Sequence, residues 1–244
     1  PDDVVLSFLP LAHSFERILD YALFWRGATI AHAESVDKVV PNLLEVRPTV
    51  MGAVPRFYEK IYAKIRESAM GMPGWKRGLF EWARRCGALE AEFRCRGAGA
   101  PLGLRWRMSI ARLLVLGKLA GRLGGRMRML ISGGGALSRD VNAYLWSLGF
   151  TVLEGYGLTE TSPVLTINRS GAARLGTVGR AIPGVEIRLA ADGEILARGP
   201  NIMKGYLNKP EETAAVLQDG WFSTGDIGEI DADGYLKITD RKKD

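Results

Sequence analysis

The sequence is poor in cysteine and histidine and has no long apolar run. Its 244 residues include two Cys and two His, and Cys86 and Cys95 lie nine positions apart, a spacing that fits no common metal site. We therefore expect free thiols in a reducing, cytoplasmic environment. No apolar run reaches the roughly 18–20 residues that cross a bilayer, and no signal peptide opens the sequence.

Internal repeats and low-complexity tracts are also missing. The composition is that of an ordinary globular chain, 47% hydrophobic and 25% charged. This length suffices for one large domain or two small ones with a sizeable core. Because Pro1 leads directly into the apolar residues 4–9 and no Met precedes it, we interpret the sequence as a piece of a longer protein.

Strand and helix signals alternate over the first 170 residues, which is typical of a parallel sheet with helices on its faces. Ser14 and Ser138 are the expected N-caps of two helices. The expected strands are residues 4–9, 29–33, 49–54, 127–131 and 151–153, and the expected helices are residues 14–25, 36–46, 56–68, 74–96, 102–123 and 138–148.

The pattern changes after about Asn168, where short β-rich runs are separated by Pro-Gly and Asp-Gly pairs. Asp-Gly between apolar runs indicates β-hairpins. We therefore predict an α/β domain over residues 1–170, with a basic helical segment at about 70–128, and a small antiparallel, barrel-like β domain over residues 171–240.

The most informative segment is residues 155–162, with the sequence GYGLTETS. It places an aromatic ring, two glycines, hydroxyls and a carboxylate in one short loop. Such a set can bind a magnesium nucleotide, because Tyr156 can stack on a base while the flanking glycines let the backbone approach. Thr159 can bind a phosphate oxygen, and Glu160 can hold Mg²⁺.

Three consecutive glycines, Gly133, Gly134 and Gly135, follow another expected strand. Without side chains, their backbone can lie against a flat base and offer amides and carbonyls to its polar edge. Ligands of open α/β sheets bind beyond the carboxyl ends of the strands. We therefore expect this loop and the loop at residues 154–160 to lie beside one ligand.

Two later segments extend the pattern, residues 220–226 (GWFSTGD) and residues 234–244 (GYLKITDRKKD). The carboxylate of Asp226 can accept two hydrogen bonds, as a ribose diol requires. The guanidinium of Arg241 can bind ribose or phosphate oxygens.

Together, these segments resemble the adenylate-forming (AMP-binding) superfamily, and most of all the bacterial long-chain fatty-acid–CoA ligases. The finer similarity comes from residues 9–17 (LPLAHSFER) and 48–58 (PTVMGAVPRFY). It covers nearly the whole chain and implies ATP, Mg²⁺, CoA and a fatty acid as ligands, with Thr159 and Glu160 catalytic and Glu160 the metal ligand. The implied nucleotide-binding residues are Gly133, Gly134, Gly135, Ala136, Glu154, Gly155, Tyr156, Gly157, Thr159, Asp226 and Arg241.

The resemblance implies two half-reactions, in which a fatty carboxylate attacks the α-phosphorus of ATP and CoA then displaces AMP. It also implies that an upstream phosphate loop and a C-terminal lid lie outside this sequence. Asp240 matches the hinge of the family, and residues 241–244 begin the connection to that lid. We expect this piece alone to have little or no ligase activity.

The acid-binding residues are less clearly indicated. His13 could act as a general base, but a fatty acid is already a carboxylate, and the resemblance favours a wall of the carboxylate pocket. Val54, Pro55 and Phe57 are candidates for the wall of an acyl tunnel, with Gly133 near the reacting carboxylate. An apolar helix end would explain the same residues.

The net charge of +6 is concentrated in one segment. Residues 60–128 hold sixteen Lys and Arg against four Glu, a local balance of +12. Three interpretations remain open: a solvated face of structural helices, peripheral contact with an anionic membrane at its inner face, or steering of CoA. No nucleic-acid-binding module is recognisable, so we expect no nucleic-acid partner.

Two alternatives to a long-chain acyl-CoA ligase remain open. An adenylating enzyme that activates another acid, or loads an acyl carrier protein, would share every nucleotide motif. A non-catalytic nucleotide- or acyl-binding module would have no need for the metal carboxylate of Glu160. Chain-length preference, thiol acceptor and oligomeric state are not determined by these motifs.

Overall fold

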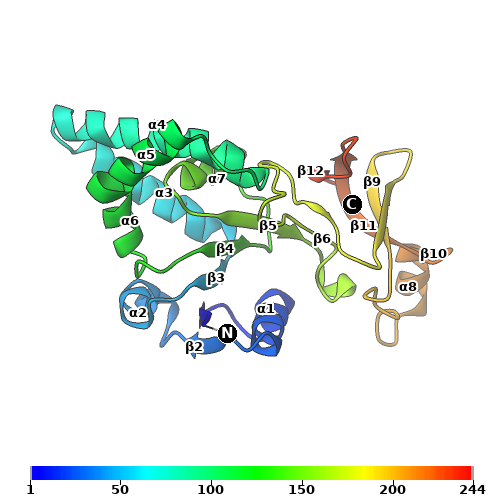
Figure 1. The fold of residues 1–244 in the computed structure, drawn as a ribbon. Helices are drawn as coiled ribbons and strands as arrows, with labels where there is room; N and C mark the ends of the chain where they lie inside the picture. The colour runs from blue at the N-terminus through cyan, green and yellow to red at the C-terminus, as the bar shows by residue number, and fades with distance from the viewer. Residues whose placement is uncertain (1, 243–244) are drawn as a thin grey trace. The chain divides into compact units, whose positions relative to one another are not determined.

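The structure is a computed structural model that describes residues 2–242 (Figure 1). The chain forms two compact units. Unit 1 contains the described residues up to Leu153 together with Ser170–Leu175, and unit 2 contains Glu154–Arg169 together with the described residues from Gly176 onward. The domain limits expected from the sequence, residues 1–170 and 171–240, remain a prediction.

The centre of unit 1 is a parallel sheet with the strand order β2-β1-β3-β4-β5. Strand β1 pairs in parallel with β2 and β3, and β3 pairs in parallel with β4. The strands are β1 (Val4–Ser7), β2 (Thr29–His32), β3 (Val50–Ala53), β4 (Met129–Ser132) and β5 (Val152–Tyr156), of which the first two residues of β5 belong to unit 1.

The two faces of this sheet are covered by different helices. Val5 and Val50 point to one face, where Leu23 of helix α1 (Ser14–Trp25) packs against them. Leu6 and Met51, one position further along each strand, point to the other face and join the large core. Because side chains alternate along a strand, the apolar runs of the sequence fill both faces, as parallel sheets require.

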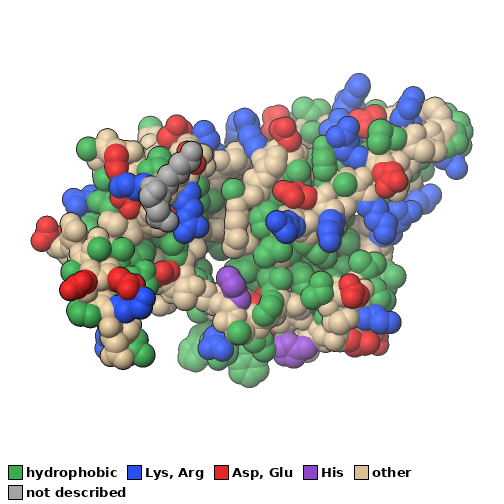
Figure 2. All heavy atoms as spheres, turned by 180° about the vertical axis from the view of Figure 1, so that it is seen from behind, with side chains coloured by type: hydrophobic (Ala, Val, Ile, Leu, Met, Phe, Trp, Pro, Cys, Tyr) green, Lys and Arg blue, Asp and Glu red, His purple; other side chains and the backbone are tan. Residues whose placement is uncertain are grey.

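The large core lies under the remaining helices of unit 1 (Figure 1). They are η1 (Val36–Lys38), α2 (Val39–Val46), α3 (Pro55–Met70), α4 (Gly74–Cys95), α5 (Leu102–Ala111), η2 (Arg112–Leu116), α6 (Gly117–Gly121) and α7 (Arg139–Ser147). The helix expected over residues 102–123 is continuous from Leu102 to Gly121 and contains one turn of π-helix, η2, between α5 and α6. Basic side chains gather over α4 and α5 (Figure 2).

Of the two predicted N-caps, Ser14 is wrong, and Ser138 is correct in position but caps without a side-chain hydrogen bond. The N-cap of α1 is His13, whose Nδ1 accepts a hydrogen bond from the Phe15 amide at 3.2 Å, and Ser14 is the first helical residue. Ser138 stands at the N-cap of α7, but its side chain makes no capping hydrogen bond. The sequence therefore predicted both helix starts to within one residue. Which side chain forms a capping hydrogen bond depends on local geometry, which the sequence did not show.

Unit 2 is antiparallel. The end of β5 pairs with β6 (Thr166–Ile167), which pairs with β7 (Arg180–Ala181). A second sheet has the order β10-β11-β9-β8, with β12 on β11. Its elements are β8 (Glu186–Leu189), β9 (Glu194–Arg198), β10 (Leu217–Gln218), β11 (Trp221–Ile230) and β12 (Leu236–Arg241), and the connections contain η3 (Thr159–Thr161) and α8 (Pro210–Val216). The predicted fold class, a helix-flanked parallel sheet followed by a small antiparallel β unit, is confirmed.

The structure bears on the two cysteines and on the absence of a long apolar run. Cys86 is buried, Cys95 is half-buried, and both are free thiols. Within residues 2–242, no helix is both long and apolar enough to span a bilayer.

Candidate functional site

The loop that follows β5 folds tightly back on itself. The buried hydroxyl of Thr161 donates a hydrogen bond of 2.6 Å to the carbonyl of Pro163 and accepts one from the Leu158 amide at 2.9 Å. Gly157 passes so close to Pro163 that a Cβ there would lie 1.5 Å from the Pro163 carbonyl oxygen. From outside the loop, the side-chain amide of Asn201 donates to the carbonyl of Thr161 at 2.8 Å. The loop is therefore fixed by the Thr161 side chain, by the close approach at Gly157 and by Asn201.

This fixed loop presents two of the predicted residues on the turn η3. Thr159 is exposed, and Glu160 is half-buried beside it. The hydroxyl of Tyr206 donates to Oε1 of Glu160 at 3.0 Å, and the Glu160 carbonyl accepts the Met203 amide at 2.7 Å. Tyr206 is a residue that sequence reasoning missed, since no local pattern links positions 46 residues apart.

The donor set at this turn fits Mg²⁺ that is bound together with phosphates. Across the described residues, no three His, Cys, Asp or Glu side chains cluster to form a metal cage. Glu160 is thus a single carboxylate, next to the hydroxyl of Thr159. Mg²⁺ is commonly bound by one or two carboxylates and completes its shell with substrate phosphates and water.

Three predicted residues that are far apart in the sequence come together in unit 2. The hydroxyl of Tyr156 donates to Oδ2 of Asp226 at 2.7 Å. Arg241 is the residue of β12 that pairs with Asp226 of β11. Burial, together with the hydrogen bond to Asp226, raises the pKa of the Tyr156 hydroxyl above its usual range. An aromatic ring, a carboxylate and a guanidinium therefore form one cluster.

Asp226 lies where strand β11 is irregular. The pairing of β11 with β9 shifts register between Ser223 and Ile227. At Gly225 the backbone has φ +74°, and its amide donates to Oε1 of the buried Glu194 at 2.9 Å. Glycine adopts this left-handed conformation without strain, so the Gly-Asp pair allows the strand to turn the carboxylate toward Tyr156.

Glu194 also anchors the end of β12. Lys242 forms ion pairs with Glu194 at 2.9 Å and with Asp192 at 2.8 Å. Asp240, the predicted hinge residue, is exposed, and its Oδ1 accepts the amide of Arg241 at 2.8 Å. Its role as a hinge remains a prediction, and residues 243–244 of the predicted connection lie outside the described part of the chain.

The glycine loop at residues 133–135 belongs to unit 1. Gly133 is buried, and a Cβ there would lie 2.8 Å from the ring of Phe15. Gly134 has φ +73°, and Gly134, Gly135 and Ala136 are exposed. The close approach to Phe15 and the positive φ explain why glycine is required at two of the three positions.

His13 is exposed at the start of α1, the helix that carries Phe15. Because Nδ1 of His13 accepts the Phe15 amide, the neutral ring carries its proton on Nε2 and presents a donor there. The side chain of Arg17 donates to the carbonyl of Leu11 at 3.0 Å and holds the same loop. This arrangement favours a wall that donates a hydrogen bond over a general base.

The predicted acyl-wall residues cluster at the start of α3. Pro55 is buried, and Val54 and Phe57 are half-buried. The Phe57 ring packs against that of Phe8, with centroids 5.3 Å apart. Val54 and Pro55 also lie beside the glycine loop, since a Cβ at Gly134 would lie 3.7 Å from Val54 and one at Gly135 would lie 3.5 Å from Pro55. The acyl-wall candidates and the glycine loop are therefore neighbours within unit 1.

Two buried carboxylates next to this cluster were not predicted. Glu16 is 1% exposed and Asp20 is 6% exposed. Oε1 of Glu16 accepts the Phe8 amide at 3.1 Å, and the Ser7 hydroxyl donates to Asp20 at 2.9 Å. Burial raises the pKa of both carboxyl groups, and the charge of Asp20 adds to the effect on Glu16. The spacing of Glu16 and Asp20, four residues apart, did not predict their burial, because exposed acidic residues on helices often have the same spacing.

The remaining predicted residues occupy β5. Glu154 is 5% exposed, and its backbone carbonyl accepts the Asn168 amide at 2.9 Å. Gly155 is half-buried and pairs with Ile167 of β6. Both residues therefore belong to the strand that supports Tyr156, and their predicted contact with a nucleotide remains a prediction.

The chain is similar to known proteins over most of its length. The sequence model of the AMP-binding enzyme family matches residues 1–207. The long-chain-fatty-acid–CoA ligase FadD15 of Mycobacterium bovis is 37% identical over 240 residues, which are 98% of this chain and 40% of the relative. The human long-chain-fatty-acid–CoA ligase 1 is 35% identical over 257 residues, which are 100% of this chain and 35% of the relative. The chain thus spans about two fifths of the length of these relatives.

Solved structures show the same fold. Apo MatB from Rhodopseudomonas palustris is 30% identical, with a TM-score of 0.67 over 100% of this chain and 41% of that protein. The N-terminal domain of FACL13 from Mycobacterium tuberculosis is 24% identical, with a TM-score of 0.67 over 98% of this chain and 51% of that chain, and supports the fold alone. Since the family model covers most of the sequence, the chain belongs to the AMP-binding enzyme family.

Proposed function

We propose that the protein containing this chain activates a long-chain fatty acid with ATP, forming first acyl-AMP and then acyl-CoA. The cluster of Tyr156, Asp226 and Arg241 carries this proposal, because the three groups can serve the base, the ribose and a phosphate of one nucleotide. Relatives that are named long-chain fatty-acid–CoA ligases, at 35–37% identity over nearly the whole chain, support the acid and the thiol acceptor.

In this proposal, unit 2 binds the nucleotide. The ring of Tyr156 stacks on the base while its hydroxyl orients Asp226 toward the ribose diol. Thr159 donates to a phosphate oxygen, and Glu160, steadied by Tyr206, holds Mg²⁺. The ion, when bound, neutralises phosphate charge. The fixed turn orients these groups before the nucleotide arrives, so alignment costs little at the moment of reaction.

Unit 1 supplies the groups for the acid in the same proposal. Val54, Pro55 and Phe57 form an apolar wall for the acyl chain, and Nε2–H of His13 donates to the carboxylate. The exposed backbone of Gly134 and Gly135 is free to approach a flat base. No group in this set needs to remove a proton, because the substrate is already ionised at neutral pH.

We also propose that the basic helical segment makes peripheral contact with an anionic membrane surface. Large apolar side chains stand exposed among its cations: Trp75 is 70% exposed, Leu102 79%, Trp106 70% and Leu113 78%. Exposed aromatic and aliphatic side chains beside Lys and Arg are typical of interfacial helices. Co-sedimentation with anionic vesicles, but not with neutral ones, would support this contact, and equal recovery with both would contradict it.

Pyrophosphate release tests the enzymatic proposal. The protein as encoded by its gene is supplied with Mg·ATP and with carboxylic acids from short to long chain and aryl acids, with and without CoA. We expect release to be greatest with long fatty acids, and thioester to form only with CoA. Glu160→Gln should abolish release, whereas Glu211→Gln, on the exposed first turn of α8, should not. Release with another acid alone would contradict the lipid assignment, and tight ATP binding without any release would indicate a non-catalytic module.

A further inference from the structure

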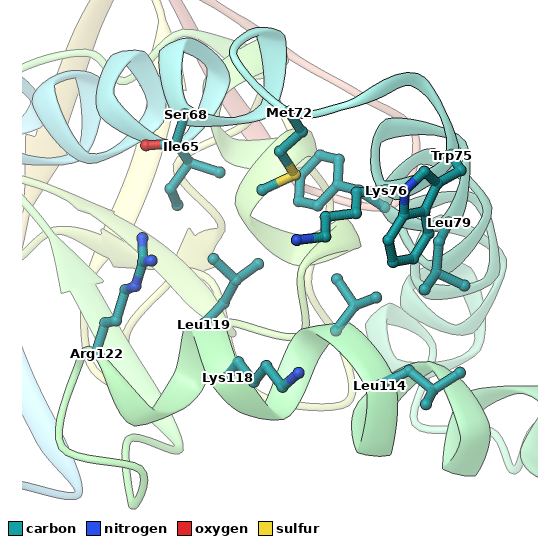
Figure 3. A pocket seen from close by; sticks show the side chains of 12 residues that line it. Ile65, Ser68, Met72, Trp75, Lys76, Leu79, Leu114, Lys118, Leu119 and Arg122 are labelled. Carbon is teal, nitrogen blue, oxygen red and sulfur yellow. The ribbon is translucent and has the colours of Figure 1, made fainter.

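A cavity of about 260 Å³ lies in unit 1, between the end of α3, the start of α4 and the η2–α6 segment (Figure 3). Its walls are largely apolar and include Ile65, Met72, Phe80 and Leu119. Met72 and Leu119 point into it from opposite sides (Figure 3). Pockets for small ligands typically measure roughly 300–1,000 Å³, so this one suits a narrow aliphatic group better than a nucleotide.

The charged groups of the cavity all have one sign. Lys76, Lys118 and Arg122 line it, and no acidic side chain does. Among the described residues, none of these three cations has an ion-pair partner, and Nζ of Lys76 lies 5.3 Å from the centre of the Trp75 ring. Three uncompensated cations around one apolar space attract an anion that carries an apolar tail.

The three cations come from two separate elements. Lys76 extends from α4 toward α6, which carries Lys118, and Arg122 directly follows α6 (Figure 3). All three are exposed, so their charges stay solvated while the aliphatic stems line the cavity. Trp75, also part of the lining, is mostly exposed at the rim. The cavity is therefore an apolar slot with a cationic mouth.

We propose that this slot binds a single-chain anionic amphiphile. The aliphatic chain would lie between Met72 and Leu119, and the head group would bind Lys76, Lys118 and Arg122. Carboxylate and phosphate head groups share the oxygen chemistry that Lys and Arg bind. This proposal goes beyond the ligase function, because none of the residues assigned to the nucleotide or the acid within the described chain lines the slot.

Equilibrium dialysis tests the proposal with the protein as encoded by its gene. The probes are dodecanoate, dodecyl phosphate and uncharged dodecanol, each below its micelle concentration and without vesicles. In the variant Lys76→Glu/Lys118→Glu, we expect one fewer dodecanoate bound per chain, or binding at this site weakened roughly tenfold or more. The matched control Lys60→Glu/Lys64→Glu makes the same charge change on exposed positions of α3 outside the slot, and should bind as the native protein does.

Equal binding by the variant and its control would overturn the proposal, as would dodecanol binding as tightly as the two anions. Whichever anion binds more tightly identifies the head group. The number of dodecanoate molecules that the native protein binds beyond the Lys76→Glu/Lys118→Glu variant tests this slot alone. The dodecanoate that still binds to the variant reports on the separately proposed acid site. The two proposals can therefore fail independently.

A second variant and a mapping experiment do not depend on charge. Ser68 is an exposed residue of the lining, and within residues 2–242 its hydroxyl bonds only to the Lys64 carbonyl of its own helix. Ser68→Trp should therefore fill the slot and remove the same bound molecule without unfolding α3. A photoreactive diazirine analogue of dodecanoate should label peptides from α3, α4 and α6. In α3 the label should fall near Ile65 and Ser68, which line the slot. Labelling confined to the start of α3, around Val54 and Phe57, would contradict the proposal.

Discussion

Replacing Tyr156 by Phe should destabilise unit 2 without disturbing its core. The change removes only the hydroxyl that donates to Asp226 at 2.7 Å. The ring, which packs against both apolar clusters of unit 2, is retained. A hydrogen bond to a charged group contributes about 1.5–3 kcal/mol. For a chain of this size, each kcal/mol lowers Tm by about 2–4 °C, so the expected decrease is about 3–12 °C.

Urea unfolding of native protein, Tyr156→Phe, Asp226→Ala and the double variant measures the pair directly. If the hydroxyl acts through Asp226, the double-mutant cycle should give a coupling energy of about 1.5–3 kcal/mol. Tyr21→Phe is the matched control, because Tyr21 is 64% exposed and its change should stay within about 0.5 kcal/mol. Isothermal titration with Mg·ATP should show weaker binding for both single variants, since each disturbs the orientation of the ribose acceptor.

Two results would refute this reasoning. A coupling energy near zero would mean that the hydrogen bond between Tyr156 and Asp226 does not stabilise the protein. Unchanged Mg·ATP affinity in Asp226→Ala would remove Asp226 from the nucleotide site, even if the stability effect were as large as expected.

Three further substitutions test close packing and burial. A Cβ at Gly87 of α4 would lie 1.9 Å from a backbone oxygen of α7, so Gly87→Ala should lower the free energy of unfolding in urea by about 1–3 kcal/mol. The control Gly78→Ala lies in open space on the same helix and should raise it by about 0.5–1 kcal/mol. Equal effects of the two changes would contradict the close contact between α4 and α7. Gly157→Ala should displace the nucleotide loop and lower Mg·ATP affinity at least tenfold, and native affinity would show that the loop is not fixed as described. Burial raises the pKa of Glu16, so the folded state binds this proton more tightly than the unfolded state does. The free energy of unfolding should therefore fall as pH rises from about 4.3 through the raised pKa. Glu16→Gln should remove this contribution when unfolding is measured between pH 4 and 8, and a pH profile identical to that of the native protein would contradict the raised pKa.

Much of the fold follows from local patterns. The apolar runs that contain Val5 and Val50 predict strands buried on both faces, and their alternation with helical stretches predicts a parallel sheet. The Asp-Gly pairs predict the change to antiparallel hairpins. These signals depend only on the period of side chains along the backbone and on the few residues that allow tight turns, so they can be read without knowing any contact. The π-turn η2, inside the expected helix, has no such signal.

Some candidate site residues were indicated by the local sequence, and others were not. The sequence singled out Tyr156, Glu160 and Asp226 because their residue types, set among glycines and hydroxyls, suit a magnesium nucleotide. It gave no sign that Tyr206 would steady Glu160. Nor did it show that His13, not Ser14, would cap α1. Capping depends on which side chain reaches the amide.

By itself, the sequence determined the order of elements, the fold class and the identity of the motif residues, because periodicity and glycine placement act over a few neighbouring positions. Tertiary structure alone decided which distant groups meet. Tyr156 and Asp226 are 70 residues apart and are joined because the end of β5 and the irregular β11 belong to one unit. Likewise, the cationic slot exists only because α4 packs beside the η2–α6 segment, a pairing that depends on complementary surfaces and not on any local pattern.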